Sequence, residues 1–376
     1  MDTSSWYDET FPELRASPPW MMGECIDASE QLARSGVVAG EAEAIAEQIR
    51  QAIADDAPIT VVGCGTSLHA AVAVAHLLEH ALAETGRVLA ADALEAALSP
   101  KPGLTIGISH DGATRATTLA LAAARAAGGH TSLITHRPSG ATASAADVTL
   151  RTPIADHSWC HTIAYTSAIL AGAAIADRLT GTHPQAPAIG DRVAALLDRV
   201  AVSPEAARAL AAARVVITTG SGVDRGTARE LALKIEEGAH VPSAHRDLEI
   251  LLHGHLVACG PETPIVLVAL DDSGRPRRLE RAALLCDAAV PLRIAVVLIA
   301  DEQAADRLAH HAAVIATLET GRPTLPSPLD AILAGAIALQ QLTLGTTHAA
   351  GTNPDLIRRE QAPWRTAAQL LDNAAW

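Results

Sequence analysis

Short runs of β-branched and apolar residues alternate along the chain with longer segments in which apolar positions recur every three or four residues. The short runs have the length of buried strands, and the longer segments have the period of amphipathic helices. This alternation predicts βαβ units around a parallel sheet. In the first half the predicted strands are 59–63, 88–91, 104–109, 131–135 and 148–151, and the predicted helices are 67–83, 114–127 and 162–179.

The second half repeats the plan, which indicates an internal duplication. Its predicted strands are 215–219, 265–269, 294–299 and 314–317, and its predicted helices are 227–240, 277–287 and 329–344. Residues 181–190 read as a linker, followed by a helix at 191–200. A chain of 376 residues suits two domains. We therefore expect an α/β protein with two doubly wound, flavodoxin-like domains, 1–190 and 191–376.

Composition narrows the classes of function. A formal net charge of −14 and a single Phe disfavour a nucleic-acid surface. The apolar runs fall short of the ~20 residues that a membrane span needs, and the N-terminus lacks the pattern of a secretory signal. Five scattered cysteines without C-x-x-C spacing indicate reduced thiols. We expect a cytoplasmic protein with neither a nucleic-acid nor a membrane partner.

Two turns rich in glycine and hydroxyl residues follow predicted strands and open onto helices. In parallel α/β sheets ligands bind at the carboxyl ends of the strands, where free N–H groups and hydroxyls can hold an anion or a polyol. The alternative is that these glycines serve only the backbone geometry of the turns. The candidate binding residues are Cys64, Gly65, Thr66 and Ser67 in the first turn, and Ser109, His110, Asp111 and Thr114 in the second.

The pair Gly-Cys-Gly-Thr-Ser and Ile-Ser-x-x-Gly-x-Thr resembles the SIS (sugar isomerase) domain family. The closest pattern is the isomerase half of glucosamine-6-phosphate synthase, together with relatives that lack the amidotransferase: amino-sugar phosphate deaminases and fructosamine phosphate deglycases. Residues 15–22 resemble the leader helix of these enzymes, and 351–355 the step before their C-terminal tail. The segment 156–162 resembles one that touches the sugar, which adds Ser158 to the predicted contacts.

The catalytic region implied by the resemblance lies at 233–238 and 252–255. It assigns Glu237 as the base that moves a proton between C1 and C2 through an enediol(ate). His253, sixteen residues later, would open the sugar ring and reach into the site of a neighbouring subunit; Lys234 lies on the same helix face as Glu237. Without the resemblance, Lys234, Glu236 and Glu237 read as a solvated, salt-bridged helix face.

Several positions depart from the family pattern. Asp111 would repel a phosphate dianion by about 4 kcal/mol at 4 Å. Three readings stay open: Asp111 caps the following helix, it pairs with protonated His110 or with Arg115, or the substrate is a neutral or sulfonated sugar. The family's C-terminal lysine maps near Ala362, which disfavours chemistry that needs it, and His255 replaces a proline.

We therefore predict a homodimeric aldose–ketose isomerase with shared active sites, acting on a small-molecule sugar or sugar derivative without a cofactor. No glutaminase domain is expected. The alternatives are a deaminase or deglycase using the same glutamate, and a non-catalytic sugar sensor. The cluster of His157, Cys160 and His161 and the pair His310–His311 are weak metal candidates, because zinc needs three or four converging ligands.

Overall fold

The computed structural model describes residues 14–36, 39–181 and 186–372, which form two compact units. We call Ser29–Ala155 with Ile163–Arg192 the first domain. The second domain comprises the described residues up to Ala28, the segment Asp156–Thr162 and the chain from Val193 onward. The boundary falls two residues beyond the predicted one, inside helix α10 (Ala186–Arg199).

The leader helix α2 (Met21–Asp27) and the segment Asp156–Thr162 belong to the second domain, whereas the sequence grouped both with the first. A buried carboxylate explains this difference. Asp355 accepts hydrogen bonds from the backbone N–H groups of Met21 and Met22, at 2.8 and 2.9 Å. Its carbonyl accepts from the N–H of Trp159 at 3.1 Å. These hydrogen bonds join the start of α2, the segment that contains Trp159 and the chain around Asp355, which are distant in the sequence.

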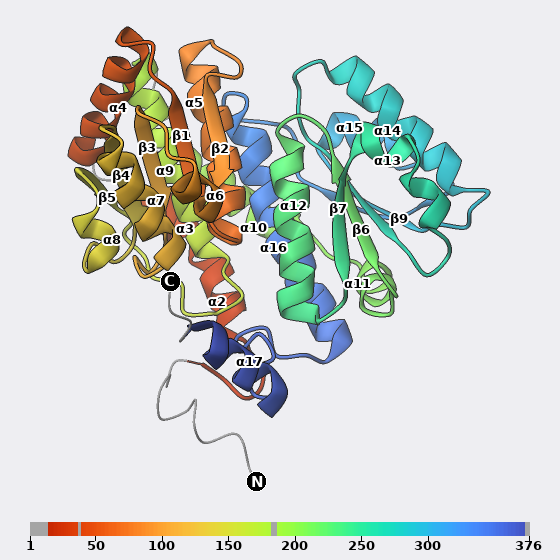
Figure 1. The fold of residues 1–376 in the computed structure, drawn as a ribbon. Helices are drawn as coiled ribbons and strands as arrows, with labels where there is room; N and C mark the ends of the chain where they lie inside the picture. The colour runs from red at the N-terminus through yellow and green to blue at the C-terminus, as the bar shows by residue number, and fades with distance from the viewer. Residues whose placement is uncertain (1–13, 37–38, 182–185, 373–376) are drawn as a thin grey trace. The chain divides into compact units, whose positions relative to one another are not determined.

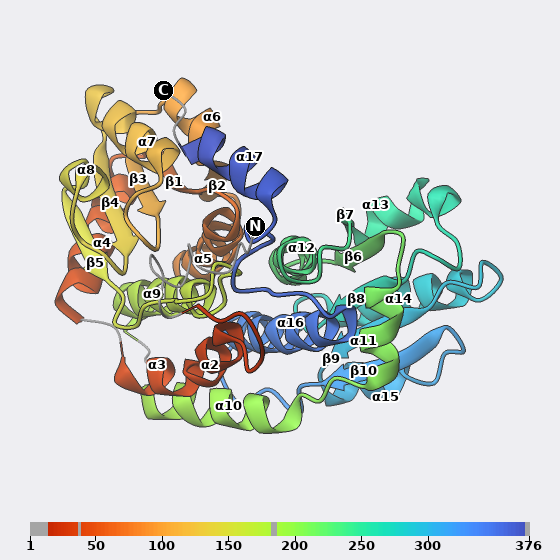
Figure 2. The same ribbon diagram turned by 90° about the horizontal axis from the view of Figure 1, so that it is seen from below.

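The first domain contains a five-stranded parallel sheet within the described residues, ordered β2-β1-β3-β4-β5. Helices α4, α5 and α9 pack on one face and α6, α7 and α8 on the other (Figures 1 and 2). The strands are β1 (Ile59–Gly63), β2 (Val88–Asp92), β3 (Leu104–Ile108), β4 (His130–Thr135) and β5 (Val148–Arg151). The helices are α3 (Ser29–Ser35), α4 (Ala39–Ala54), α5 (Thr66–Leu82), α6 (Ala93–Leu98), α7 (Arg115–Ala126), α8 (Ala141–Ser144) and α9 (Ile163–Thr180).

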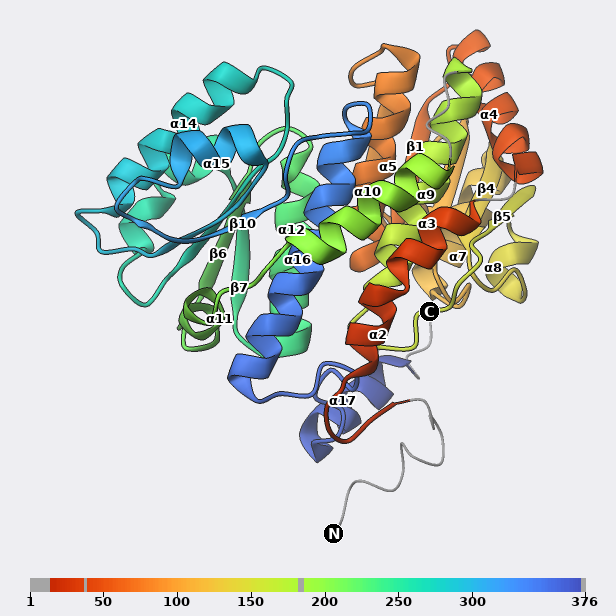
Figure 3. The same cartoon turned by 180° about the vertical axis from the view of Figure 1, so that it is seen from behind.

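The second domain has the equivalent sheet, ordered β7-β6-β8-β9-β10 and also parallel. Helices α11, α12 and α16 cover one face and α13, α14 and α15 the other (Figure 3). The strands are β6 (Val216–Gly220), β7 (Ser243–Asp247), β8 (Ile265–Ala269), β9 (Val296–Ala300) and β10 (Val314–Glu319). The helices are α11 (Pro204–Ala211), α12 (Asp224–Lys234), α13 (Leu248–Leu252), α14 (Arg275–Ala289), α15 (Glu302–Leu308), α16 (Leu329–Ala350) and α17 (Ala362–Asp372).

Helix packing in the first domain depends on one small residue. Gly172 in α9 lies against Val74 in α5, and a Cβ atom at position 172 would stand 2.7 Å from Val74 Cγ2. The two helices are Ala-rich where they meet, so their backbones approach closely on the sheet. This layer supports β1, whose carboxyl end carries the first predicted binding turn.

The fold class and the duplication are confirmed, and the corrections are local. The strand β7 was not predicted, because Ser243–Asp247 is polar and each of its residues is only partly buried. Residues 186–190, expected in a linker, are helical, and 182–185 lie outside the described residues. The predicted helix 227–240 begins earlier, at Asp224, and changes to a π-helical turn over Ile235–Ala239.

Among the described residues, α16 has the length and apolar composition of a membrane span. Its most apolar window is 83% buried inside the protein. Its buried face includes Gln340, whose amide donates to the carbonyl of Thr162 at 2.9 Å. Such burial is typical of a core helix around which a domain packs.

Candidate functional site

The first predicted binding turn joins β1 to α5. Gly63 is required there, because a Cβ atom would lie 2.5 Å from the backbone of Ser67. Gly65 has φ +53°, in the left-handed region that glycine tolerates. The N–H of Ser67 donates to the carbonyl of Cys64 at 3.0 Å, which tightens the turn. Burial, reinforced by the Asp92 carboxylate, raises the pKa of the Cys64 thiol, so this cysteine favours its neutral form.

The second predicted turn follows β3, which pairs directly with β1. The Ser109 side chain is buried, and its hydroxyl donates to the Thr114 hydroxyl at 3.0 Å. The carbonyl of His110 accepts from the Thr135 hydroxyl and from the N–H of His136. Because β1 and β3 are parallel neighbours, both turns lie at the same edge of the sheet. The structure thus brings the two predicted sets together; their contact with a sugar stays a prediction.

Asp111 lies in the second turn with a half-exposed side chain. Its carboxylate forms a long ion pair, 4.0 Å, with Arg137 from the segment after β4, a residue that the sequence argument did not consider. The N-cap position of α7 is Thr114, not Asp111. The cation that the structure shows beside Asp111 is Arg137, which none of the three readings included, and the choice of substrate stays a prediction. The sequence did not indicate this pair, because Arg137 follows β4 whereas Asp111 follows β3.

The predicted catalytic pair lies at the end of α12. Lys234 is fully buried, and its ammonium group lies between two carboxylates. It donates a short hydrogen bond to Glu237 and stands 3.6 Å from Glu230, which is also buried. The Glu237 side chain is 25% exposed, so it can reach both the ammonium and solvent. The alternative of a solvated, salt-bridged helix face is therefore wrong for Lys234.

Electrostatics keeps this lysine charged in spite of its burial. Burial alone lowers the pKa of Lys234, but the carboxylates of Glu237 and Glu230 outweigh it, and the pKa is raised. Glu230 was not predicted as a site residue, although its spacing four residues before Lys234 was a usable signal. The neighbouring thiol of Cys160 donates weakly to the carbonyl of Lys234, and burial raises the pKa of this thiol.

Glu237 lies in the π-helical turn Ile235–Ala239. π-Turns are rare and are found often at functional sites. Gly238 fits a narrow space here, because a Cβ atom would stand 3.0 Å from Thr347 Oγ1 in α16. The Thr352 hydroxyl donates to the carbonyl of Gly238 at 2.7 Å, which satisfies an acceptor exposed by the irregular turn. Helix α16 and the following segment thereby fix the backbone that presents Glu237.

His253 follows α13 and has a side chain that is 70% exposed. Its Nε2 atom lies 2.9 Å from Glu249, which also binds Arg281. No hydrogen bond or ion pair joins His253 to Glu237 within the described residues, so the structure does not bring these two predicted groups together. Gly254, with φ +124°, turns the chain directly after the histidine. The exposure suits a group that acts outside its own chain; this role stays a prediction.

Ser158 is buried in the second domain. Its N–H donates to Asp156 at 3.2 Å, and its hydroxyl oxygen is buried without a hydrogen-bond partner among the described residues. The resemblance placed Ser158 against the sugar, whereas the contacts in the structure give it a role in fastening the segment 156–162. Its predicted contact with substrate is not tested by this arrangement.

The weak metal candidates have other contacts. Cys160 packs in a core cluster with Met22, and His161 lies 3.8 Å from Asp156. His311 Nδ1 lies 2.7 Å from Asp287. Among the residues that the structure describes, no group of three or more His, Cys, Asp and Glu side chains is arranged to hold a metal ion.

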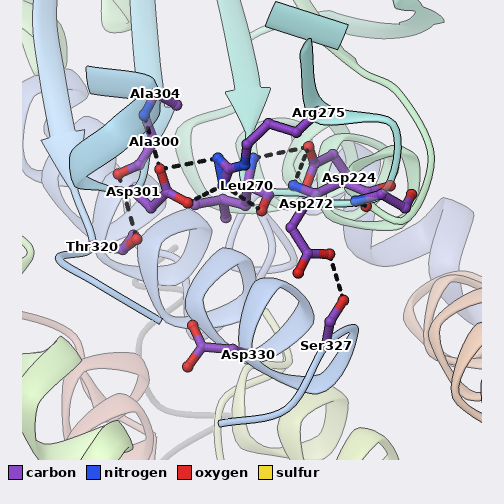
Figure 4. Close-up of polar contacts among 12 residues, drawn as sticks. Asp224, Leu270, Asp272, Arg275, Ala300, Asp301, Ala304, Thr320, Ser327 and Asp330 are labelled. Carbon is purple, nitrogen blue, oxygen red and sulfur yellow. Dashed lines mark hydrogen bonds and ion pairs between the residues drawn. The ribbon is translucent and has the colours of Figure 1, made fainter. Parts of the chain in front are cut away.

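The corresponding strand edge of the second domain carries a network of aspartates (Figure 4). Asp224, in the first turn of α12, accepts from the N–H groups of Leu270 and Asp271 after β8. Arg275 pairs with Asp301 after β9 and donates to the carbonyl of Leu270. These contacts join the segments that follow β6, β8 and β9.

One of these carboxylates makes stability depend on pH. Burial raises the pKa of Asp224 to about 7, and the backbone N–H groups of Asp271 and Leu270 oppose the shift only in part. The folded state then holds the proton more tightly than the unfolded chain, where the pKa of Asp is about 3.9. The contribution of Asp224 to stability is therefore full below about pH 4 and is lost as the pH rises to 7.

We expect Asp224→Asn to flatten the fall in stability between pH 5 and 7.5 by about 2.5 kcal/mol, because about two of the three pH units between the unfolded and folded pKa values lie in this range. Asparagine keeps an oxygen for the two N–H groups and removes the charge. Urea unfolding of wild type and variant at pH 5, 6, 7 and 8 measures the effect, with Asp272→Asn, a change to an exposed neighbour, as the matched control. Parallel pH profiles for wild type and Asp224→Asn would contradict the assignment.

Known structures share this fold. The C-terminal domain of glucosamine-fructose-6-phosphate aminotransferase from Francisella tularensis is 18% identical, with TM-score 0.74, covering 89% of this chain and 98% of that one. The tagatose-6-phosphate ketose/aldose isomerase from Escherichia coli is 17% identical, with TM-score 0.71, covering 92% and 97%. A glucosamine-6-phosphate deaminase from Thermotoga maritima is 17% identical, with TM-score 0.64, covering 89% and 97%.

Comparisons of sequence agree with these comparisons of structure. Glutamine--fructose-6-phosphate aminotransferase [isomerizing] of Zymomonas mobilis is 27% identical over 229 residues, which are 56% of this chain. The chain thus matches only 37% of the length of that relative. The model of the SIS domain matches residues 52–179 and 209–345, one stretch in each half. Because these two matches span more than half of its length, the chain belongs to the SIS domain family.

Proposed function

We propose that this protein is an aldose–ketose isomerase that acts on a sugar phosphate or a related sugar derivative through an enediol(ate). The observation that carries the proposal is Glu237, a partly exposed carboxylate that binds a fully buried ammonium group. A base that removes a carbon-bound proton has to be ionised before the reaction and accessible to substrate. Lys234 places a positive charge beside the Glu237 carboxylate, and the exposure of Glu237 supplies the access.

A single carboxylate can carry the proton from one carbon to the other. Glu237 removes the proton from C2, beside the C1 carbonyl, which leaves an enediol(ate), and returns it to C1. The hydroxyl proton of O2 passes to O1 in the same exchange, so the aldose becomes the ketose without gain or loss of atoms. The positive charge of Lys234 remains in place while Glu237 alternates between its charged and neutral forms. Glu230 keeps that lysine paired at the moment when Glu237 is protonated. We assign ring opening to His253, within a homodimer, on the resemblance and on the exposure of its imidazole.

The two turns of the first domain are assigned to the distal end of the sugar. Ser67, Ser109 and Thr114 offer hydroxyls, and α5 begins at Thr66 with N–H groups suited to an anion. Asp111 opposes a phosphate there, and Arg137 offsets it at 4.0 Å. A sulfonated sugar, with one negative charge in place of two, would meet less repulsion from Asp111.

The test is solvent exchange on a panel of sugars. Glucose 6-phosphate, fructose 6-phosphate, glucosamine 6-phosphate, a 6-sulfonated glucose and the neutral parents are incubated with the protein in D₂O, and proton NMR follows the C1 and C2 positions. Ammonia is assayed in parallel. We expect exchange and interconversion for one charged sugar without release of ammonia.

Each other outcome has a meaning. Ammonia from the amino sugar would replace isomerisation with deamination by the same glutamate, an activity named for the Thermotoga maritima structure. A thermal shift with a sugar, but neither exchange nor ammonia, would overturn the proposal in favour of a sensor. Asp111→Ser, run beside the wild type, identifies the substrate class. Stronger binding of phosphosugars in this variant would show that Asp111 selects against them.

A further inference from the structure

The two domains carry the same binding turn, and strand register aligns them residue by residue. Gly63 and Gly220 end the equivalent strands β1 and β6, and each lies against the residue four positions later. Gly65 and Gly222 then have φ +53° and +62°. The following positions therefore correspond, with Asp224 in the place of Ser67.

The same register relates the second turns. Thr60 pairs with Thr105 in the first sheet, as Ile217 pairs with Ile265 in the second. Counting forward along β3 and β8 from these pairs places Asp271 in the position of Asp111. The two aspartates behave differently, since Asp111 is half exposed and Asp271 is 5% exposed.

Asp271 occupies the glycine turn of its own domain. Its Oδ2 atom accepts from the N–H of Val223 at 3.0 Å and lies 3.4 Å from the guanidinium of Arg278. Its Oδ1 atom accepts from the N–H of Ser273 at 2.8 Å. A Cβ atom at Gly222 would stand 1.8 Å from Oδ2, so the carboxylate lies directly on the glycine. A backbone N–H and an arginine are the donors expected around a bound oxyanion, and a glycine permits its close approach.

The rest of this turn is held by a second aspartate. Asp224 is 3% exposed, and its Oδ2 atom accepts from Leu270 and Asp271. Its Oδ1 atom is buried without a hydrogen-bond partner. A buried carboxylate oxygen without a hydrogen-bond donor destabilises the folded protein. The turn therefore holds carboxylates for which the protein does not supply every hydrogen-bond donor.

We propose that the second domain contains a latent oxyanion site that is occupied by the carboxylate of Asp271, and that removing this side chain lets the turn bind a phosphate group. The bound anion would accept from Val223 and pair with Arg278, as Asp271 does now. The second domain would therefore bind no phosphosugar in the native protein. This inference concerns the second domain alone and holds whether or not Glu237 catalyses isomerisation.

The experiment measures phosphate binding by equilibrium dialysis and by thermal shift, with inorganic phosphate against chloride at equal ionic strength. The wild type gives the baseline, including any phosphate that the first domain binds. We expect Asp271→Ser to bind one more phosphate per chain, and its Tm to rise by about 2–4 °C at ten times the Kd. Asp224→Asn/Asp271→Ser should bind more tightly, because the remaining negative charge of the turn is also removed.

Two controls test the location. Asp272→Ser removes an exposed aspartate from the same loop, whose side chain contacts Ser327, and should behave as the wild type. Arg278→Gln in the Asp271→Ser background should abolish the additional binding. Unchanged phosphate binding in both folded variants that lack Asp271 would overturn the proposal. If Asp271→Ser unfolds, the double variant carries the test; if both unfold, restoration of a cooperative transition by phosphate supports the proposal, and its absence overturns it.

Discussion

Glu237→Gln will slow the exchange of the sugar C1 and C2 protons with solvent by about 10²–10⁴-fold, the usual contribution of a positioned general base. Glutamine has nearly the same shape and can still accept a hydrogen bond from Lys234, but it cannot take up a proton at neutral pH. The exchange assay described above measures the rate on the sugar that the wild type uses. Thermal shift with that sugar should change little, since Glu237 acts on the reacting carbons.

The matched control is Glu236→Gln. Glu236 is the neighbouring carboxylate, is exposed, and accepts from the N–H of Ser243 at 3.1 Å, a bond that glutamine preserves. It should retain wild-type exchange. If Glu237→Gln keeps more than a tenth of the wild-type rate while remaining folded, Glu237 is not the base and the proposed mechanism fails.

Lys234→Met will lower the free energy of unfolding by about 3–5 kcal/mol, the cost of removing one partner from a buried ion pair. Methionine fills similar space, but Glu230, which is buried, loses the cation that neutralises it. Urea unfolding at pH 7.5 measures the loss.

Lysine 101 provides the comparison, since it is the other lysine of the chain and is exposed. Lys101→Met should change stability by less than about 0.5 kcal/mol, as is usual for a surface position. Lys234→Met/Glu230→Gln should recover part of the loss by removing the buried negative charge that Lys234 balanced. A loss below about 1 kcal/mol for Lys234→Met alone would mean that solvent reaches the pair.

The sequence predicted the central strands β1, β3, β6, β8 and β9 well because they are buried almost throughout, which leaves little freedom of composition. β1, β5 and β8 have the expected bounds, and the other predicted strands differ by one or two residues at one or both ends. The strand β7 was not predicted, because its residues, Ser-Ala-His-Arg-Asp, are only partly buried and show no alternation of apolar and polar positions. Its pairing with β6 depends on backbone hydrogen bonds, which composition does not reveal.

The sequence predicted which residues lie in the candidate site, but it did not predict which of them are buried or what surrounds them. Spacing placed Lys234 and Glu237 on one helix face, but it could not say whether that face meets water or α16. The structure buries it, because α12 and α16 pack together and the π-helical turn redirects the chain. The contact between Arg137 and Asp111 was not predicted either, because only the folded sheet brings these two residues together.

The π-helical turn also bears on how distant relatives are to be aligned. A π-helical turn has hydrogen bonds between residues i and i+5, so it contains about one more residue than a turn of α-helix. Deleting Gly238 would restore α-helical spacing and rotate everything that follows by about 100°. A relative without the extra residue would then need a one-position gap here, directly after the glutamate. An ungapped alignment would pair every later residue, His253 included, with the wrong neighbour.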